Sequence, residues 1–107
     1  MKLIVAIVNY DDAGAVTRAL TKARFSTTKL ATTGGFLLAT NATILTGVRD
    51  ERVQEAIDVI RAHSKSRKQV VPPASELGSG VFSGIPVEVT VGGATIFVVD
   101  VERFERV

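Results

Sequence analysis

A short apolar run at the start of the chain constrains the fold more than any other feature. After Met1 and Lys2, the residues from Leu3 to Val8 are all apolar and mostly β-branched, and Asn9 ends the run. This pattern predicts a buried central strand. The run is too short for a membrane span or for the apolar part of a signal peptide. We therefore expect a soluble, cytoplasmic protein built around this strand.

Two helices are expected from apolar residues at helical spacing. The first covers 13–23, and Asp11 or Asp12 is expected to cap it. The second is expected to begin at a cap formed by Asp50 and to end near His63. The inner faces consist of Val16, Ala19, Leu20 and Ala23 in the first helix, and of Val53, Ile57 and Ile60 in the second.

The remaining apolar segments are short and predict strands. They cover 25–31, 36–39, 43–48, 87–91 and 94–101, with a turn at Thr40–Asn41. The pair Gly92–Gly93 is a hairpin signal, so we expect the last two strands to pair with each other. Between the second helix and this hairpin, residues 64–84 are polar and rich in glycine and proline, which predicts a long, mobile loop.

The order of these elements is β-α-β-β-α-β with one additional C-terminal hairpin strand. This is the ferredoxin-like plan of the α+β class, in which two helices cover one face of an antiparallel sheet. At 107 residues, the chain is expected to form a single domain, residues 1–107.

Composition excludes several kinds of function. The chain has no cysteine and one histidine, so thiolate chemistry and zinc–thiolate sites are excluded. We expect no metal site, because no group of acidic residues and histidine has ligand spacing. The net charge is only +2 with scattered cations, whereas nucleic-acid binding needs clustered ones. No catalytic triad can be assigned, and we do not expect an enzyme.

The segment from Thr28 to Leu37 carries the clearest chemical signal. It combines hydroxyl side chains, the pair Gly34–Gly35 and the aromatic Phe36. Adjacent glycines can aim backbone N–H groups at an anion, and an aromatic ring beside them can stack on a base. The same residues could also be a plain turn and a core phenylalanine. The combination suits a nucleotide better than a metal, a peptide or a lipid.

These residues resemble the signature of the cyclic-di-AMP receptor family of Gram-positive bacteria, which is related to the PII signal-transduction proteins. The resemblance covers nearly the whole chain. It rests on Thr28–Leu37, on Asn41-x-Thr43 with Gly47–Val48, and on Pro86–Val89 followed by Val91–Val98. It implies a PII-like homotrimer with ligand pockets between the subunits and two loops that respond to ligand. Members of this family are not known as enzymes.

The resemblance also implies roles for individual residues. Phe36 and Leu37 would wall an adenine pocket, and Gly35 would meet a phosphate. The amide of Asn41, which can donate and accept at once, would recognise an adenine edge. The hydroxyl of Thr28 would bond a base or a sugar. Gly47 would let its backbone meet the ligand, because glycine within a strand often marks a close approach.

One departure from the family pattern concerns the residue that faces the ligand. Family members commonly carry an arginine where this chain has Ser26, and this chain has Arg24 two positions earlier. In a strand, Arg24 would share the face of Ser26 and Thr28, displaced from Ser26 by roughly 6.6 Å. Arg24 would then partly replace the missing guanidinium. Alternatively, Arg24 is a solvated cation at the end of the first helix.

We therefore expect a receptor that binds cyclic-di-AMP, without a further cofactor, and signals to an unknown protein partner. Because an arginine is missing at position 26, another adenine nucleotide such as ATP or ADP is an alternative ligand. A trimeric scaffold that binds its partner without any ligand is an alternative of a different class.

Overall fold

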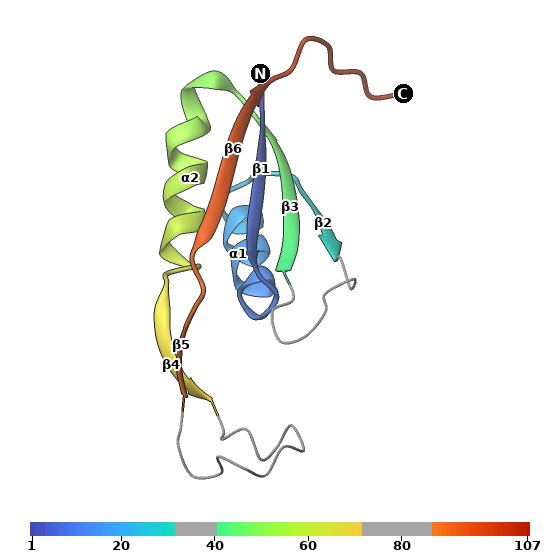
Figure 1. The fold of residues 1–107 in the computed structure, drawn as a ribbon. Coiled ribbons are helices and arrows are strands. Elements are labelled where there is room, and N and C mark those ends of the chain that lie inside the picture. Colours follow the sequence, from blue (N-terminus) through green and yellow to red (C-terminus); the bar gives the residue numbers. More distant parts are fainter. Residues whose placement is uncertain (32–40, 72–86) are drawn as a thin grey trace.

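The computed structural model describes residues 1–31, 41–71 and 87–107. Its helices are α1 and α2, its strands are β1 to β6, and η1 is a single 3-10 turn before α2 (Figure 1). In chain order the elements are β1 (Lys2–Asn9), α1 (Tyr10–Lys22), β2 (Thr27–Ala31), β3 (Asn41–Val48), η1 (Asp50–Arg52), α2 (Val53–Ala62), β4 (Arg67–Val71), β5 (Val87–Val91) and β6 (Ala94–Asp100).

Four strands form the main sheet in the order β2-β3-β1-β6, and every neighbouring pair is antiparallel. Both helices lie on the same side of this sheet (Figure 1). The expected ferredoxin-like arrangement is confirmed, with β1 at the centre as the apolar run predicted. The outermost strands β2 and β6 have no partner on their outer edges within the described residues.

The core lies between the sheet and the helices. Side chains alternate along a strand, so every second residue of β1 and β3 points toward the helices. Apolar side chains from both helices pack against them, which removes apolar surface from water and stabilises this layer. The buried apolar residues are Ile4, Ala6, Val8, Ala13, Val16, Leu20, Phe25, Ala42, Ile44, Val48, Ala56 and Ile60.

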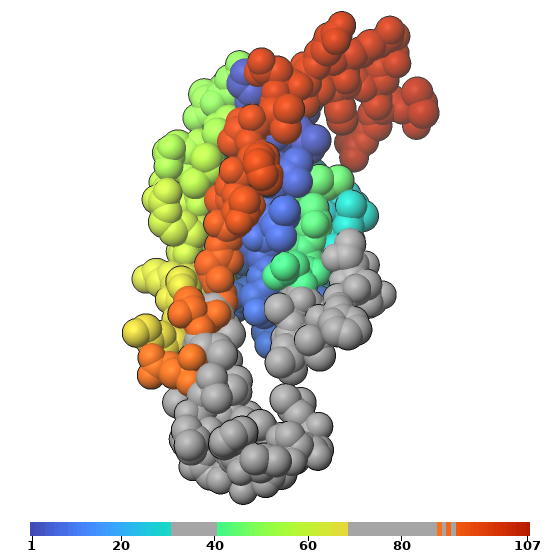
Figure 2. Space-filling model, in the orientation of Figure 1, coloured from blue at the N-terminus to red at the C-terminus, as the bar shows by residue number. Residues whose placement is uncertain are grey.

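No helix among the described residues covers the opposite face of the sheet, which is nevertheless apolar. Figure 2 shows β6, β1, β3 and β2 side by side across this surface, which we call the open face. The strand register places Val5 beside Leu45 and Phe97 there, and the Phe97 side chain is 55% exposed. The open face comprises Leu3, Val5, Ile7, Thr28, Leu30, Asn41, Thr43, Leu45, Gly47, Phe97 and Val99.

The expected hairpin between the last two strands is wrong. Strand β5 pairs with β4 in a separate two-stranded ribbon, whereas β6 pairs with β1 along Ala94–Asp100. Gly92 and Gly93 connect the two sheets, and their φ angles of 86° and 82° lie in the left-handed region that favours glycine. The glycine pair therefore marks a tight connection, as expected, but the chain continues from the ribbon into the main sheet instead of folding back.

The expected loop at 64–84 also needs correction. Its residues Arg67–Val71 form β4, and the ribbon extends past the end of the main sheet (Figure 1). The segment has no clear alternation of apolar and polar residues, so pairing with β5 imposes the strand there, not local pattern. Residues 72–84 lie outside the described residues, as does the predicted strand at 36–39. The other ligand-responsive loop that the resemblance implies covers 36–43, and its residues 41–43 belong to β3, so the turn expected at Thr40–Asn41 does not include Asn41.

The residues that cap the two helices are not the ones expected from the sequence. Asn9 caps α1, because its side-chain oxygen accepts a hydrogen bond from the Asp11 backbone N–H at 2.9 Å. Asp12 instead forms an ion pair with Arg67. Asp50 is the first residue of η1 and not the cap of α2, which starts three residues later without a side-chain cap. His63 ends α2 as expected.

Candidate functional site

Two adjoining hollows at one end of the main sheet contain four of the five described residues that the sequence predicts to bind ligand. The first, which we call the arginine hollow, has a volume of about 350 Å³ and contains Arg24, Ser26 and Gly47. The second lies on the open face, has a volume of about 400 Å³ and contains Ser26, Thr28 and Gly47. The arginine hollow is completed by Met1, Phe25, Val48, Arg49 and Arg52, and the open-face hollow by Met1, Leu3, Leu45, Val101 and Phe104.

Ser26 and Gly47 belong to both hollows because β2 and β3 pair at this point. Thr46 faces the core, and its hydroxyl donates a hydrogen bond to the carbonyl of Ser26 at 2.9 Å. This bond fixes Ser26 just before β2 begins. A Cβ added at Gly47 would meet only the Met1 side chain, at 3.5 Å. Nothing described in this chain therefore requires glycine at position 47, and the space beside it is open to a ligand or a neighbouring copy.

Arg24 reaches the arginine hollow by a different route from the one expected. It lies in the turn between α1 and β2 with a φ of 70°, and its backbone N–H donates to the carbonyl of Thr21 at 2.9 Å. Because β2 begins only at Thr27, strand alternation does not extend back to Arg24. The expected strand geometry is wrong, although Arg24 and Ser26 do line the same hollow.

The arginine hollow has an excess of positive charge. The Arg52 guanidinium lies 4.0 Å from the centre of the Phe25 ring, donates to the carbonyl of Ala23, and forms an ion pair with Glu55. Arg52 donates two hydrogen bonds to the Glu55 carboxylate, and these bonds lower the pKa of the Glu55 carboxyl and raise the pKa of Arg52. Arg24 and Arg49 form no ion pair with the described residues, so their charges are available to an anion.

Asn41 lies at the other end of the main sheet. It starts β3, opposite Asn9 of β1, and lines a third hollow of about 450 Å³ beneath the ribbon, which we call the ribbon hollow. The lining is rich in hydroxyl and amide groups. Its residues are Ile7, Val8, Asn9, Asn41, Ser66, Thr90, Gly92, Gly93, Ala94 and Thr95.

The candidate site residues are thus divided within one chain. Asn41 and Gly47 share the open face of β3 but lie six residues apart, which corresponds to about 20 Å along a strand. Arg24, Ser26, Thr28 and Gly47 lie together at the far end from Asn41. Gly35, Phe36 and Leu37 lie outside the described residues. The sequence analysis did not identify Ser66, Thr90 and Thr95, whose hydroxyls lie around Asn41 in the ribbon hollow. The only sequence signal near them is the Gly92–Gly93 pair, which also lines this hollow.

The family model described as cyclic-di-AMP receptor matches residues 1–107, which is the whole chain. The chain belongs to the cyclic-di-AMP receptor family. The chain is also similar to the crystal structure of a functionally unknown protein from Pediococcus pentosaceus ATCC 25745. The two sequences are 37% identical, the match covers 99% of this chain and 96% of the other, and the TM-score is 0.75. The described fold is therefore shared along nearly the full length of both chains.

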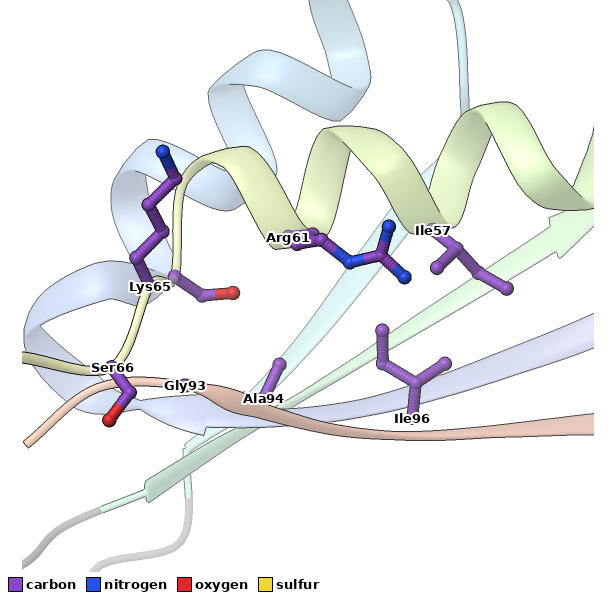
Figure 3. Close-up of a pocket in the computed structure, with 8 residues that line it drawn as sticks. Ile57, Arg61, Lys65, Ser66, Gly93, Ala94 and Ile96 are labelled. Atoms are coloured by element: carbon purple, nitrogen blue, oxygen red, sulfur yellow. The ribbon is translucent and has the colours of Figure 1, made fainter.

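A further hollow in this cyclic-di-AMP receptor family member contains none of the predicted residues. It has a volume of about 560 Å³ and lies between α2 and the start of β6 (Figure 3). Ile57 and Arg61 of α2 face Ala94 and Ile96 of β6, while the Lys65 side chain points away from the hollow. Its floor is largely apolar, and Arg61 is already paired with Asp58. This lining gives no chemical reason to assign the nucleotide to it.

The described part of this receptor family member lacks two other kinds of feature. No group of three or more histidine and acidic residues there could hold a metal ion. No helix among those residues is long and apolar enough to cross a membrane.

Proposed function

We propose that this chain is a non-enzymatic, PII-like cytoplasmic receptor that binds cyclic-di-AMP at the interfaces of a homotrimer. The observation that carries a site shared between copies is the division of its residues, and the family resemblance implies that the copies number three. A single copy holds Asn41 and the group around Gly47 about 20 Å apart on one face. A nucleotide that contacts both groups closely needs them from two copies, and the family match supports cyclic-di-AMP as that nucleotide.

The residues at the two ends of the main sheet suit the phosphates and the adenines of such a ligand. Cyclic-di-AMP carries two negatively charged phosphodiesters and two adenines. Arg24 and Arg49 in the arginine hollow supply charge-assisted donors for a phosphate. Thr28 lies exposed on the open face and can bond a sugar or a base. At the opposite end, the amide of Asn41 can read an adenine edge, while Phe36 would stack on the ring as the family resemblance implies.

The open face supports association of the copies. Its apolar side chains Val5, Leu45 and Phe97 lie on one uncovered surface. Contiguous apolar surface of this kind marks protein interfaces. Packing of three open faces around a common axis would bury it and place the end that bears Gly47 in one copy beside the end that bears Asn41 in the next.

Ligand binding would signal by shifting the balance between conformations of the loops that border the site. Such a shift requires that the ligand bind one loop conformation more tightly than the others. A partner protein that reads the favoured conformation would complete the signal.

Calorimetric titration of the purified protein with cyclic-di-AMP tests the function directly. We expect saturable binding, weakened about tenfold in Thr28→Val, because loss of one hydrogen bond costs about 1 kcal/mol or slightly more. Thr27→Val is the matched control, since Thr27 neighbours Thr28 but points to the helix side and should bind normally. The absence of both binding heat and a ligand-induced rise in melting temperature would refute a receptor function and favour a ligand-independent scaffold.

ATP or ADP is retained as a second candidate because Ser26 lies in both hollows where the family commonly has an arginine. Competition between cyclic-di-AMP, ATP and ADP in the same titration separates these ligands. Tighter binding of ATP or ADP than of cyclic-di-AMP would show that the serine changes the preferred nucleotide.

A further inference from the structure

An ion pair anchors the β4–β5 ribbon to the helix layer. Arg67, the first residue of β4, donates from Nη2 to Oδ1 of Asp12 at 3.2 Å and from Nη1 to Oδ2 at 3.3 Å. The Asp12 side chain, in the first turn of α1, is only 12% exposed. Within residues 1–31, 41–71 and 87–107, this is the one ion pair that joins the ribbon to either helix.

The backbone around this pair is closely packed. Arg67 also donates from Nη1 to the carbonyl of Lys65 at 3.3 Å. A Cβ added at Gly92 would lie 2.4 Å from that carbonyl oxygen and 2.7 Å from the same Nη1. The connection from α2 into β4 and the connection from β5 into β6 therefore meet at the Arg67 guanidinium. Figure 3 shows this root of the ribbon, with Ser66 beside Gly93.

The anchored segments are also the walls of the ribbon hollow. Ser66, Thr90 and Gly92 come from the ribbon side, while Asn9 and Asn41 come from the main sheet. Asn9 caps α1 three residues before Asp12, so both partners of the ion pair lie close in sequence to a wall of the hollow. A two-stranded ribbon has little core of its own, so its direction depends on such anchors.

We propose that the Asp12–Arg67 ion pair positions the ribbon relative to Asn41 and thereby sets the shape of the nucleotide site; this inference rests on the proposed function. Neither residue needs to touch the ligand. Asp12 is mostly buried and held by Arg67, and Arg67 donates three hydrogen bonds, two to Asp12 and one to the Lys65 carbonyl. Their effect on binding is indirect, because they hold the hydroxyl and backbone groups of the ribbon at one distance from the sheet.

The variant Asp12→Asn distinguishes positioning from direct contact. It keeps the size of the side chain but removes its charge, and it leaves the Arg67 guanidinium less engaged. If Arg67 bound a phosphate directly, releasing it would leave affinity for cyclic-di-AMP unchanged or raise it. Positioning predicts the opposite, a weakening of about tenfold. Asp58→Asn is the matched control, because Asp58 also pairs with an arginine, Arg61, but lies on α2 away from the ribbon.

A distance measurement tests the same claim without any ligand. The chain has no cysteine, so Lys22→Cys on α1 and Lys68→Cys on β4 give two unique positions for spin labels. Pulsed electron paramagnetic resonance should give a narrow distance distribution in the labelled protein. The distribution should stay narrow when Asp58→Asn is added. Adding Asp12→Asn should broaden or shift it. Arg67→Lys, which keeps the charge but loses the forked geometry, should behave like Asp12→Asn and serves if the latter folds poorly.

The outcomes are separable. An unchanged distance distribution in Asp12→Asn overturns the inference, and so does unchanged affinity in that variant when the unmodified chain binds normally. If the unmodified chain binds no cyclic-di-AMP, the proposed function fails instead, and the distance measurement still reports whether the ion pair fixes the ribbon.

Discussion

At the scale of single residues, Arg24 combines backbone strain with a charge that no described residue pairs in an ion pair. It is the only described residue other than glycine with a positive φ, at 70°. The left-handed region costs an ordinary side chain roughly 1–2 kcal/mol. Because Arg24 also lines the arginine hollow, this strained backbone marks it as a candidate functional residue.

Arg24→Asn separates these two properties. Asparagine tolerates positive φ better than most residues, so the melting temperature of the ligand-free protein should stay the same or rise. Affinity for cyclic-di-AMP should fall about tenfold or more, because a hydrogen bond from a charged donor contributes about 1.5–3 kcal/mol. Calorimetry and a thermal melt measure the two effects.

Arg18→Asn is the control for charge, since Arg18 is an exposed cation on α1 outside the arginine hollow. Equal affinities for Arg24→Asn and the unmodified chain would show that Arg24 is only a solvated cation, and the compensation for Ser26 would have to be abandoned.

At the scale of elements, the start of α2 is tied to the turn before β2 by Arg52. This side chain covers the Phe25 ring, donates to the Ala23 carbonyl, and donates to both oxygens of Glu55 at 3.0 Å. Glu55 thus orients Arg52, and Arg52 closes one wall of the arginine hollow. The lowered pKa of the Glu55 carboxyl reports this interaction.

The pair predicts a pH dependence of stability. A carboxyl whose pKa is lower in the folded than in the unfolded chain adds stability above the unfolded value and loses it as the pH falls through the folded one. Glu55→Gln should therefore lower the melting temperature modestly at pH 7. The difference should shrink as the pH falls below the usual range of a glutamate. Melts of both proteins from pH 7 to pH 3 check this, and a constant difference across that range would contradict the pairing.

The two connecting glycines should differ in their tolerance of a side chain. Both have positive φ, so replacing either with alanine should cost about 1–2 kcal/mol of unfolding free energy. A Cβ at Gly92 would also collide with the Lys65 carbonyl at 2.4 Å, whereas one at Gly93 would meet Ser66 at an ordinary 3.7 Å. Urea denaturation should show a larger loss for Gly92→Ala than for Gly93→Ala. Equal losses would mean that the root of the ribbon relaxes freely.

These elements also show what a sequence can and cannot reveal. The continuous apolar run in β1 and the helical spacing in α2 identified both elements, because each pattern reflects one local environment or geometry. The partner of β5 was mispredicted, because an alternating segment indicates a strand but not its neighbour, and β4 lacks the pattern altogether. Arg24 was placed beside Ser26 for the wrong geometric reason. The distance between Asn41 and Gly47 could not be predicted, because it follows from both residues lying in one continuous strand, six residues apart.

At the scale of the whole molecule, the two faces of the sheet differ in how far their side chains are exposed. The helix side contains residues with almost no exposure, such as Ile4 and Ile44. The open face carries apolar side chains of similar type without a covering layer. Phe97 and Val98 are neighbours in β6, are both substantially exposed, and point to opposite faces because Phe97 lies beside Val5 and Val98 beside Ile4.

These two residues provide a matched test of the proposed trimer. Phe97→Asp places a charge on the open face, where burial between copies would be costly. We expect sedimentation velocity to show three times the chain mass for the unmodified protein and a largely monomeric Phe97→Asp. Val98→Asp carries the same charge on the other face and should remain trimeric. Because the proposed site takes residues from two copies, Phe97→Asp should also lose cyclic-di-AMP binding while keeping its circular dichroism spectrum. A folded, monomeric Phe97→Asp that binds the nucleotide normally would place the whole site within one chain.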